Sequence, residues 1–332
     1  MKFLIVGFGS IGRRHFRNLL SLGYEDIIFY RSHKSSLECD ELEGFPVETS
    51  LESALAHEPD AVVVSNPTAL HLDVAIPAAK AGCHILLEKP ISHNMNRVAE
   101  LQEAAEKSGS RILMGFQYRF HPGLRRIKRW LAQEAIGRPL SARVHWGEYL
   151  PNWHPWENYQ ESFSARADLG GGVLLTLSHP LDYLRWLLGE IDSVWAYLGY
   201  NSDLELNGVE DTAEIGFRFT NGVTGSLHLN YVQRPPSHWL EIIGTEGTIR
   251  WNAETGVAKC YNIEEKTWEE FPLRANFERN DLYISEMKHF VAVVMGQFVP
   301  ICSLEDGVAV QKIVQGAKQS SEQGLITALE VA

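Results

Sequence analysis

The sequence predicts two domains, an N-terminal α/β domain built on a parallel sheet and a C-terminal α+β domain. Its 332 residues suggest about two domains of roughly 150 residues each. Through residue 120, apolar strand-like runs alternate with helical runs, which is typical of a parallel sheet covered on both faces. From residue 121 onward, strand-like runs follow one another without helices, which favours antiparallel pairing. We therefore expect the domains to be residues 1–120 and 121–332.

The chain begins with a strand, a glycine turn and a helix. Residues 3–6 are consecutive apolar residues, and residues 13–20 carry apolar side chains at helical spacing. The glycines between them have G-x-G-x-x-G spacing in the context that a dinucleotide-binding fingerprint requires. Such glycines allow a tight turn, a close approach to a pyrophosphate and close helix packing, while the helix N–H groups face the phosphates. A purely structural turn is the alternative. We expect cofactor contacts from Gly7, Phe8, Gly9, Ser10, Ile11 and Gly12.

The end of the second predicted strand bears on the choice of cofactor. NAD-binding proteins usually carry Asp or Glu there, about 20 residues past the glycines. This chain has Arg31, Ser32 and Lys34, and no acidic residue before Glu38. A guanidinium can donate several hydrogen bonds to a 2′-phosphate, and a hydroxyl can add another. We therefore favour NADP, with contacts from Arg31 and Ser32. NAD, with a solvated basic turn here, is the alternative.

Further strands and helices complete the first half. Ser50 can cap a helix that runs to Ala56, and Pro77 predicts a kink or a break in the helix over residues 70–81. The expected strands are residues 26–30, 60–64, 84–88 and 111–115, and a further helix covers residues 96–107.

Two strand ends carry polar residues that a purely structural strand does not need. They are Ser65-Asn66-Pro67-Thr68-Ala69-Leu70-His71 and Glu88-Lys89-Pro90. Ligands bind at the carboxyl ends of strands in such sheets. Lys89 could polarise a substrate oxygen, and partial burial would depress its pKa toward proton transfer. An ordinary strand-to-helix turn is the alternative.

The second half contains strand-like runs separated by turns. A helix over residues 123–133 leads to an alternating strand at 140–147, and Asn221-Gly222 between two strand-like runs is a hairpin signal. We expect the outer face of this sheet to be too apolar to remain exposed, so that the protein forms a homo-oligomer, a dimer or tetramer, through it. The later strands are expected at residues 213–219, 223–232, 238–243, 248–251 and 257–261.

Several motifs together resemble the glucose–fructose oxidoreductase / inositol dehydrogenase / MocA family. They are the glycine fingerprint, Asn66 to His71, Glu88-Lys89-Pro90, His121-Pro122, Gly170-Gly171-Gly172 and His179-Pro180-Leu181-Asp182. The resemblance spans the chain as far as a C-terminal helix ending near Gly324. It implies a Rossmann domain and a second domain with a large, mostly antiparallel open sheet. It also implies a lysine that contacts nicotinamide ribose and substrate, and a histidine that assists proton transfer. Cofactor contacts are then expected from Asn66, Pro67, His71, Glu88 and Lys89.

The expected catalytic residues are Lys89, His179 and Tyr118. His179 and Asp182 lie at i and i+3 on a helix predicted to run from the three glycines through Trp186, so Asp182 could orient His179 or bind substrate hydroxyls. The family usually has an aspartate one turn before the histidine, where this chain has Leu175 and Thr176. Proton transfer would then depend on Lys89, His179 and Tyr118. A core histidine is the alternative for His179.

An aromatic stretch at residues 149–157 is the expected substrate side. Its tryptophans can stack on sugar rings, and Arg166 could meet a phosphate or carboxylate. A loop held by its own aromatic rings and an ordinary surface arginine are the alternatives. The candidate substrate-binding residues are Lys89, Tyr118, Trp153, His154, Trp156, Arg166, His179 and Asp182.

Composition narrows the class of protein. A formal net charge of −12 argues against nucleic-acid and anionic-membrane partners. The four cysteines are scattered without a C-x-x-C pair, and no apolar run reaches membrane-spanning length, so we expect a cytoplasmic protein with reduced thiols.

The expected activity is hydride transfer between a nicotinamide and a hydroxyl or keto carbon of a sugar, including an activated or amino sugar of polysaccharide biosynthesis. The alternatives are an oxidoreductase for a non-sugar ketone or imine, and a cofactor-binding regulatory or structural protein without turnover. A zinc site of His145, His154 and His179 is a further alternative, but no H-E-x-x-H spacing supports it, and we expect no metal.

Overall fold

The computed structural model describes residues 1–31 and 40–330, so Ser32 and Lys34 lie outside the described residues. The chain forms two compact units. Unit 1 comprises Met1–Gln117 and Glu278–Val308, and unit 2 comprises Tyr118–Phe277 and Ala309–Ala332. The expected boundary at residues 120–121 lies close to the first crossing. The segment 278–308, which the sequence analysis assigned to the second domain, belongs to unit 1.

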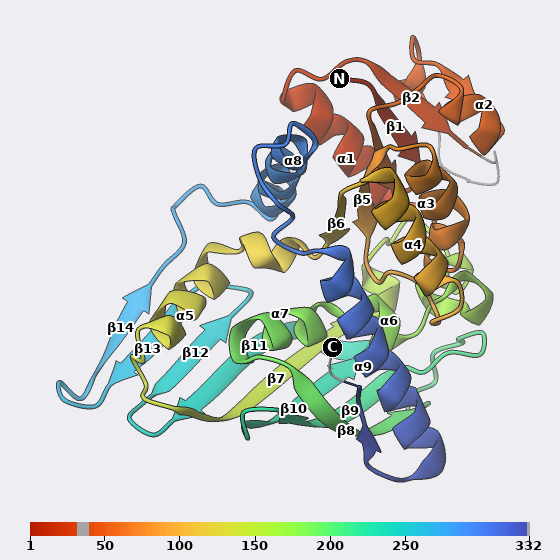
Figure 1. The fold of residues 1–332 in the computed structure, drawn as a ribbon. Helices are drawn as coiled ribbons and strands as arrows, with labels where there is room; N and C mark the ends of the chain where they lie inside the picture. Colours follow the sequence, from red (N-terminus) through yellow and green to blue (C-terminus); the bar gives the residue numbers. More distant parts are fainter. Residues whose placement is uncertain (32–39, 331–332) are drawn as a thin grey trace. The chain divides into compact units, whose positions relative to one another are not determined.

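Unit 1 is built on a six-stranded parallel sheet, as predicted (Figure 1). The strand order β3-β2-β1-β4-β5-β6 reverses direction between β1 and β4. Their carboxyl ends therefore form the switch point at which doubly wound sheets bind ligands. The strands are β1 (Phe3–Val6), β2 (Ile27–Tyr30), β3 (Val47–Glu48), β4 (Ala61–Val64), β5 (His84–Glu88) and β6 (Ile112–Gly115).

Helices cover this sheet. Ser50 caps α2 as predicted, since its side chain accepts a hydrogen bond from the Ser53 N–H at 3.0 Å. A kink or a break was predicted at Pro77, and the break does not occur, because α3 continues through this residue. The helices of unit 1 are α1 (Ser10–Ser21), α2 (Leu51–Leu55), α3 (His71–Lys80), α4 (Val98–Ser108) and α8 (Asn280–Val294).

The segment of unit 1 that returns from the far end of the sequence contains α8, which the sequence analysis did not predict. It packs beside α1 (Figure 1). The Asn280 side chain donates a hydrogen bond to Asn18 Oδ1 at 2.9 Å, and Gln117 donates to the Tyr283 hydroxyl at 3.1 Å. These contacts explain why residues 278–308 fold with the first unit.

Unit 2 contains a nine-stranded sheet in the order β14-β13-β12-β11-β7-β10-β9-β8-β15. Every pair is antiparallel except β10 and β7, which confirms the mostly antiparallel expectation. The predicted hairpin joins β9 to β10, with Gly222 at φ +85°. The strands are β7 (Pro139–Tyr149), β8 (Ile191–Gly199), β9 (Thr212–Phe219), β10 (Thr224–Asn230), β11 (Val232–Gly244), β12 (Thr248–Asn252), β13 (Ala258–Asn262), β14 (Thr267–Phe271) and β15 (Thr327–Ala328).

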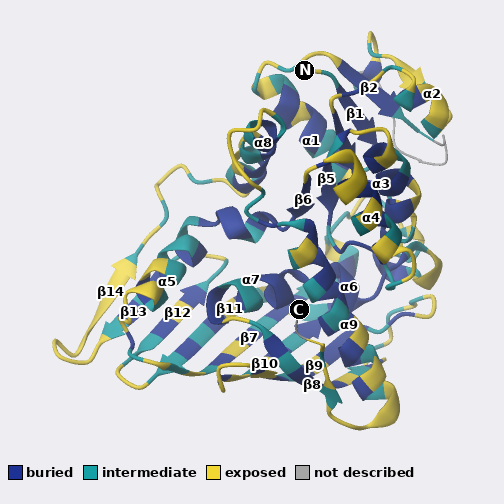
Figure 2. Cartoon of the chain, viewed as in Figure 1, coloured by how far each residue is buried: buried dark blue, intermediate teal, exposed yellow. Residues whose placement is uncertain are grey.

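Helices lie on one face of the large sheet, where side chains are buried (Figure 2). The helix predicted from the glycines through Trp186 is in fact two helices. Gly172, at φ +101°, precedes α6, and Pro180 in the first turn of α7 begins a new helix. His179 is therefore the first residue of α7 instead of lying inside a longer helix. The helices are α5 (Pro122–Ala132), α6 (Val173–Thr176), α7 (His179–Leu188) and α9 (Leu304–Gln323).

The opposite face of the large sheet is mixed in character. Trp195, Tyr197 and Trp239 are 47%, 49% and 37% exposed on it. Ion pairs such as Arg250 with Glu241 lie on the same face. Charged pairs therefore alternate with aromatic side chains on this face, and the expected oligomerisation through it stays a prediction. In the described ranges, no helix combines the length and apolar character needed to cross a membrane.

Candidate active site

The glycine turn after β1 has the shape that the fingerprint predicts. Gly7 has φ +88°, and a Cβ there would lie 2.8 Å from the Asn66 backbone nitrogen. A Cβ on Gly12 would lie 2.2 Å from the Gly7 carbonyl oxygen. Around Gly9, by contrast, a Cβ would meet no described atom within 4 Å. The outer glycines thus shape the turn, and the middle one leaves the backbone open to a ligand.

The N-terminus of α1 offers hydrogen-bond donors beside this turn. Gly9 caps the helix without a side-chain hydrogen bond, and the first turn contains no acidic residue. The first N–H groups of a helix have no acceptor within the helix and carry partial positive charge, so they favour phosphate. Residues 7–12 therefore fit the pyrophosphate of a dinucleotide.

Residues at the end of β4 complete this side of the switch point. The Ser65 hydroxyl lies 2.9 Å from the Val6 carbonyl oxygen and 3.1 Å from that of Gly7, and it ties the two strand ends together. Asn66 donates from Nδ2 to the Leu70 carbonyl oxygen at 3.2 Å. Its buried Oδ1 has no hydrogen-bond partner among the described residues. A buried acceptor of this kind fits a donor on a ligand.

Arg31 follows β2, where the sequence analysis placed the contact to a 2′-phosphate. Its backbone N–H donates to the Glu48 carbonyl oxygen at 3.1 Å, which fixes the main chain at the strand end. The predicted contacts of Arg31 and Ser32 with the cofactor remain predictions.

His71 connects the two polar strand ends. Its Nδ1 lies 2.9 Å from the Pro90 carbonyl oxygen, and its Nε2 lies 3.0 Å from that of Asn66. The side chain is 1% exposed, and burial lowers the pKa of His71 below its usual value. Because both ring nitrogens face backbone carbonyls, the geometry favours a structural role over the predicted cofactor contact.

Lys89 follows β5, and among the lysines of the described residues its pKa is the one lowered far enough to approach neutral pH. Burial lowers its pKa to about 8, the neighbouring carboxylate of Glu88 opposes this shift, and the charge of Arg279 adds to it. This is the depression that the sequence analysis expected. A lysine with such a pKa can both accept and donate a proton near neutral pH.

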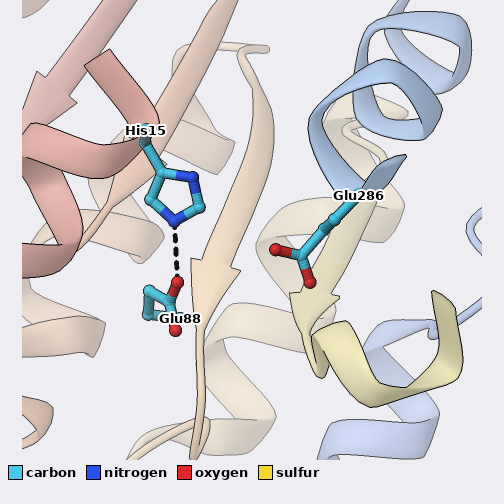
Figure 3. A group of neighbouring side chains, drawn as sticks. All are labelled: His15, Glu88 and Glu286. Atoms are coloured by element: carbon cyan, nitrogen blue, oxygen red, sulfur yellow. Dashed lines mark hydrogen bonds and ion pairs between the residues drawn. The ribbon is translucent and has the colours of Figure 1, made fainter. Parts of the chain in front are cut away.

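Glu88 turns toward the interior of unit 1, where His15 Nε2 lies 2.7 Å from its Oε1 (Figure 3). Burial alone would raise the pKa of Glu88. The hydrogen bond from His15 and the nearby positive charges outweigh burial and hold it below the usual value. Glu88 therefore remains ionised beside Lys89.

Glu286 of α8 faces this pair (Figure 3). Ligand atoms of His15, Glu88 and Glu286 lie within 4.8 Å of one another, the one such grouping of potential metal ligands in residues 1–31 and 40–330. Glu286 is fully buried, and its carboxylate oxygens have no hydrogen-bond partner among those residues. Burial, then the charge of Glu88, raises the pKa of Glu286 well above 4.5. A proton is thus enough to neutralise Glu286, and we assign no metal here.

In unit 2, the structure brings together two of the predicted catalytic residues. His179, 3% exposed at the start of α7, lies with its ring centroid 5.1 Å from that of Tyr118. The Trp146 ring lies 5.8 Å from His179 and 5.7 Å from Tyr118. Tyr118 is half-buried in this aromatic cluster.

Asp182 was predicted to orient His179 or to bind substrate hydroxyls, but its carboxylate forms an ion pair with Arg119 instead. Arg119 donates to its carboxylate from Nη2 at 2.7 Å and from Nε at 3.0 Å, and the two side chains are almost fully buried. This geometry favours a structural role over a substrate contact. Arg119 neighbours Tyr118 in the chain and Asp182 lies one turn after His179, so the ion pair fixes the two rings relative to each other.

His238 of β11 was missed as a site residue. Its Nδ1 lies 3.5 Å from the Tyr118 hydroxyl, its Nε2 lies 3.1 Å from the Tyr183 hydroxyl, and its ring stacks on Trp146 at 4.2 Å. In the sequence, His238 only begins an alternating strand. The available signal was its register, since it shares the buried face with Leu240.

The aromatic segment before α6 is only partly packed. Trp153 meets Tyr231 edge to face at 5.5 Å, and its buried Nε1 lacks an acceptor among the described residues. The His154 ring meets the Trp156 ring edge to face at 5.4 Å, and Trp156 is 72% exposed. Arg166 forms an ion pair with Asp168 at 2.6 Å. Trp153 thus retains a donor for a ligand, whereas Arg166 is engaged locally.

The proposed zinc ligands do not come together. His145 stacks on His228 at 4.9 Å on the outer face of the large sheet, whereas His179 lies on the helix-covered face. Over the described ranges, these histidines form no group of potential metal ligands with His154. The zinc alternative therefore has no support from the geometry.

Comparison with known proteins identifies the family of this chain. The description "Oxidoreductase family, NAD-binding Rossmann fold" matches residues 1–116, and "GFO/IDH/MocA C-terminal domain" matches residues 124–250. Myo-inositol 2-dehydrogenase of Thermotoga maritima is 28% identical, covering 99% of each chain. The 1,5-anhydro-D-fructose reductase of Ensifer adhaerens is 28% identical, covering 78% of this chain and 77% of that protein. Levoglucosan dehydrogenase in complex with NADH shares the fold, with a TM-score of 0.88, 22% identity and full coverage of both chains. The chain therefore belongs to the GFO/IDH/MocA family of oxidoreductases, with an NAD-binding Rossmann fold in its first unit.

Proposed function

We propose that this protein transfers a hydride between a nicotinamide cofactor and a hydroxyl-bearing carbon of a carbohydrate. The observation that carries the proposal is Lys89, whose pKa burial lowers to about 8, in a unit whose glycine turn fits a dinucleotide. The relatives named for an inositol and for anhydro sugars support a substrate with several hydroxyl groups.

The protein residues supply binding and proton transfer in this proposal. The bound nicotinamide supplies the hydride chemistry. Residues 7–12 hold the pyrophosphate, and Lys89 takes the hydroxyl proton during oxidation or returns it during reduction. Its pKa of about 8 makes both protonation states accessible at neutral pH. His179 and Tyr118 orient the substrate hydroxyls and share the proton.

We further propose that the preferred cofactor is NADP. Arg31 supports this choice, since it stands after β2, where an acidic residue would favour NAD. The support for a sugar, including an activated or amino sugar, is the aromatic segment in which Trp153 retains a buried indole N–H without an acceptor among the described residues. Aromatic rings and single polar groups of this kind are typical of small-molecule sites.

The outer face of the large sheet is the surface that we propose for a homodimer or homotetramer. Trp195, Tyr197 and Trp239 support it, because exposed aromatic side chains are enriched at interfaces. Light scattering coupled to size exclusion would test the assembly, and Trp195→Lys with Trp239→Lys should yield monomers. We also propose a cytoplasmic location, which the free thiols of Cys83, Cys260 and Cys302 support.

The direct test is turnover with a panel of polyols, sugars and sugar nucleotides, followed by the absorbance of the reduced nicotinamide. Lys89→Met should bind the cofactor and lose about two to four orders of magnitude in kcat. Undiminished turnover in this variant would contradict the mechanism. A regulatory protein would instead bind the cofactor and turn over no substrate of the panel.

A further inference from the structure

Three polar side chains from separate segments of unit 2 form a chain of hydrogen bonds. Tyr118 precedes α5, His238 lies on β11, and Tyr183 lies on α7. His238 Nδ1 is 3.5 Å from the Tyr118 hydroxyl, a long contact, and His238 Nε2 is 3.1 Å from the Tyr183 hydroxyl. Both ring nitrogens of the histidine are thus directed at phenol groups.

Burial increases along this chain. Tyr118 is half-buried, His238 is 4% exposed and Tyr183 is fully buried. Tyr118 is therefore the member that a small molecule can reach. It is also the member that contacts His179, at 5.1 Å between ring centroids.

The imidazole of His238 is held in a fixed orientation. It stacks on Trp146 with an interplanar angle of 1° and meets the edge of Trp251 at 5.0 Å. Trp146 and Trp251 are buried on the helix-covered face of the sheet. A ring clamped in this way can change its protonation state without changing its position.

We propose that His238 is a positioning residue that orients the Tyr118 hydroxyl and holds the proton that Tyr118 passes inward. This inference rests on the proposed function and deepens it. His238 would supply a proton acceptor to a protein that has Leu175 and Thr176, and no acidic residue, one turn before His179.

In this proposal a hydride leaves the substrate while a proton moves inward along the hydrogen-bonded chain. As the substrate C–H bond breaks, its electron pair leaves as hydride to the oxidised nicotinamide. Lys89 and Tyr118 share the substrate hydroxyl proton, and whenever Tyr118 accepts it, the proton of Tyr118 moves to Nδ1 of neutral His238. The products are a carbonyl, reduced nicotinamide and an imidazolium whose two N–H groups donate to Tyr118 and Tyr183. Burial raises the pKa of Tyr183 well above 10, so Tyr183 stays a neutral phenol that can accept this bond.

The surroundings of His238 contain few other titratable groups. Tyr118, His121, His179 and Tyr183 contribute rings to the same cluster. Arg119, which follows Tyr118 in the chain, forms an ion pair with Asp182, which lies one turn after His179. His121 offers a matched control, because it is equally buried and contacts Tyr118, yet its Nδ1 accepts from the Gly123 N–H.

The experiment compares His238→Asn, Tyr118→Phe, their double variant and His121→Asn as the control. The asparagine amide can still donate toward Tyr118 but cannot accept a proton. We expect His238→Asn to lower kcat about 10²-fold with KM nearly unchanged and to remove one ionisation from the pH profile. The double variant should lose no more than the worse single variant, because the two residues act as a unit. His121→Asn should keep the wild-type pH profile.

A kcat of wild-type size in His238→Asn, or losses that multiply in the double variant, would overturn the inference. The same loss in His121→Asn would also overturn it, since the effect would then be general packing. A measurement without turnover keeps the inference separate from the proposed function. The ¹⁵N resonances of His238 should shift in both Tyr118→Phe and Tyr183→Phe, and unchanged resonances would show that the hydrogen-bonded chain is absent. A wild-type protein without turnover, but with these shifts, would contradict the proposed function alone.

Discussion

The pH dependence of substrate oxidation should report the pKa of Lys89 and move in opposite directions when two charged neighbours are removed. Burial lowers this pKa to about 8, the carboxylate of Glu88 raises it and the charge of Arg279 lowers it. Arg279→Met should therefore raise the pKa of Lys89, and Glu88→Gln should lower it further.

The size of the effect follows from the fraction of neutral lysine. A base with a pKa of about 8 is roughly one-tenth neutral at pH 7 and fully neutral two units above its pKa. The kcat/KM for oxidation at pH 7 should thus be about a tenth of its plateau. In Arg279→Met, the pH range over which kcat/KM rises should move to higher pH, which lowers the rate at pH 7. In Glu88→Gln it should move to lower pH, with a plateau that is reached earlier.

The assay is the initial rate of nicotinamide reduction at limiting substrate, measured from about pH 6 to 10. Arg250→Met is the matched control, because it removes an equal charge from an ion pair on the outer face of the large sheet. The rise of kcat/KM with pH in this variant should coincide with that of the wild type. Shifts of Arg279→Met and Glu88→Gln in the same direction, or no shift in either, would refute the assignment of Lys89 as the base.

Three further outcomes are expected. Arg31→Asp should abolish the preference for NADPH, a change of about ten- to over a hundred-fold for a charge-assisted contact of roughly 1.5–3 kcal/mol, and wild-type selectivity in kcat/KM would contradict the role of Arg31. Burial lowers the pKa of His121 to about 4 from 6.5, so its contribution to stability should be complete above pH 6.5 and lost as the pH falls toward 4, by up to about 3 kcal/mol. Thermal unfolding against pH should show this loss in the wild type and a flatter curve in His121→Asn. Trp153→Ala should raise KM for a sugar more than it lowers kcat, since stacking holds substrate and transition state about equally, and a change in kcat alone would argue against this contact.

The sequence predicted the first sheet almost strand by strand, because its strands are short, continuous apolar runs. The five-residue strand β5 (His84–Glu88) has the predicted limits. The return of α8 to unit 1 could not be predicted, since it depends on contacts between residues far apart in the chain, such as Asn18 with Asn280. The split between α6 and α7 has a local cause that was available, because Pro180 is favoured in a first helical turn.

Candidate site residues could be chosen from the sequence where a polar residue interrupts an apolar pattern or belongs to a motif. Lys89 ends an apolar strand, and His179 stands in a short motif. His238 and Glu286 were not found, because a polar residue on the buried face of a strand or helix leaves the hydrophobic period nearly intact. His15 shares a helix face with Leu19 and is hidden in the same way. Only the packing reveals that each of these three polar side chains is buried.

The motif residues also differ in whether their polar atoms already have partners within the chain. His71 has both ring nitrogens directed at backbone carbonyls, and the carboxylate of Asp182 is held by Arg119. Asn66 Oδ1 and Trp153 Nε1 are buried without partners among the described residues. An unpaired buried polar atom costs about 1–3 kcal/mol, and a ligand that pairs it recovers this free energy. Asn66→Ala and Trp153→Phe should therefore weaken ligand binding with little loss of stability, whereas His71→Ala and Asp182→Ala should lower stability first. Calorimetric binding and thermal unfolding of the four variants would separate the two groups, and a large loss of stability in Asn66→Ala would contradict the division.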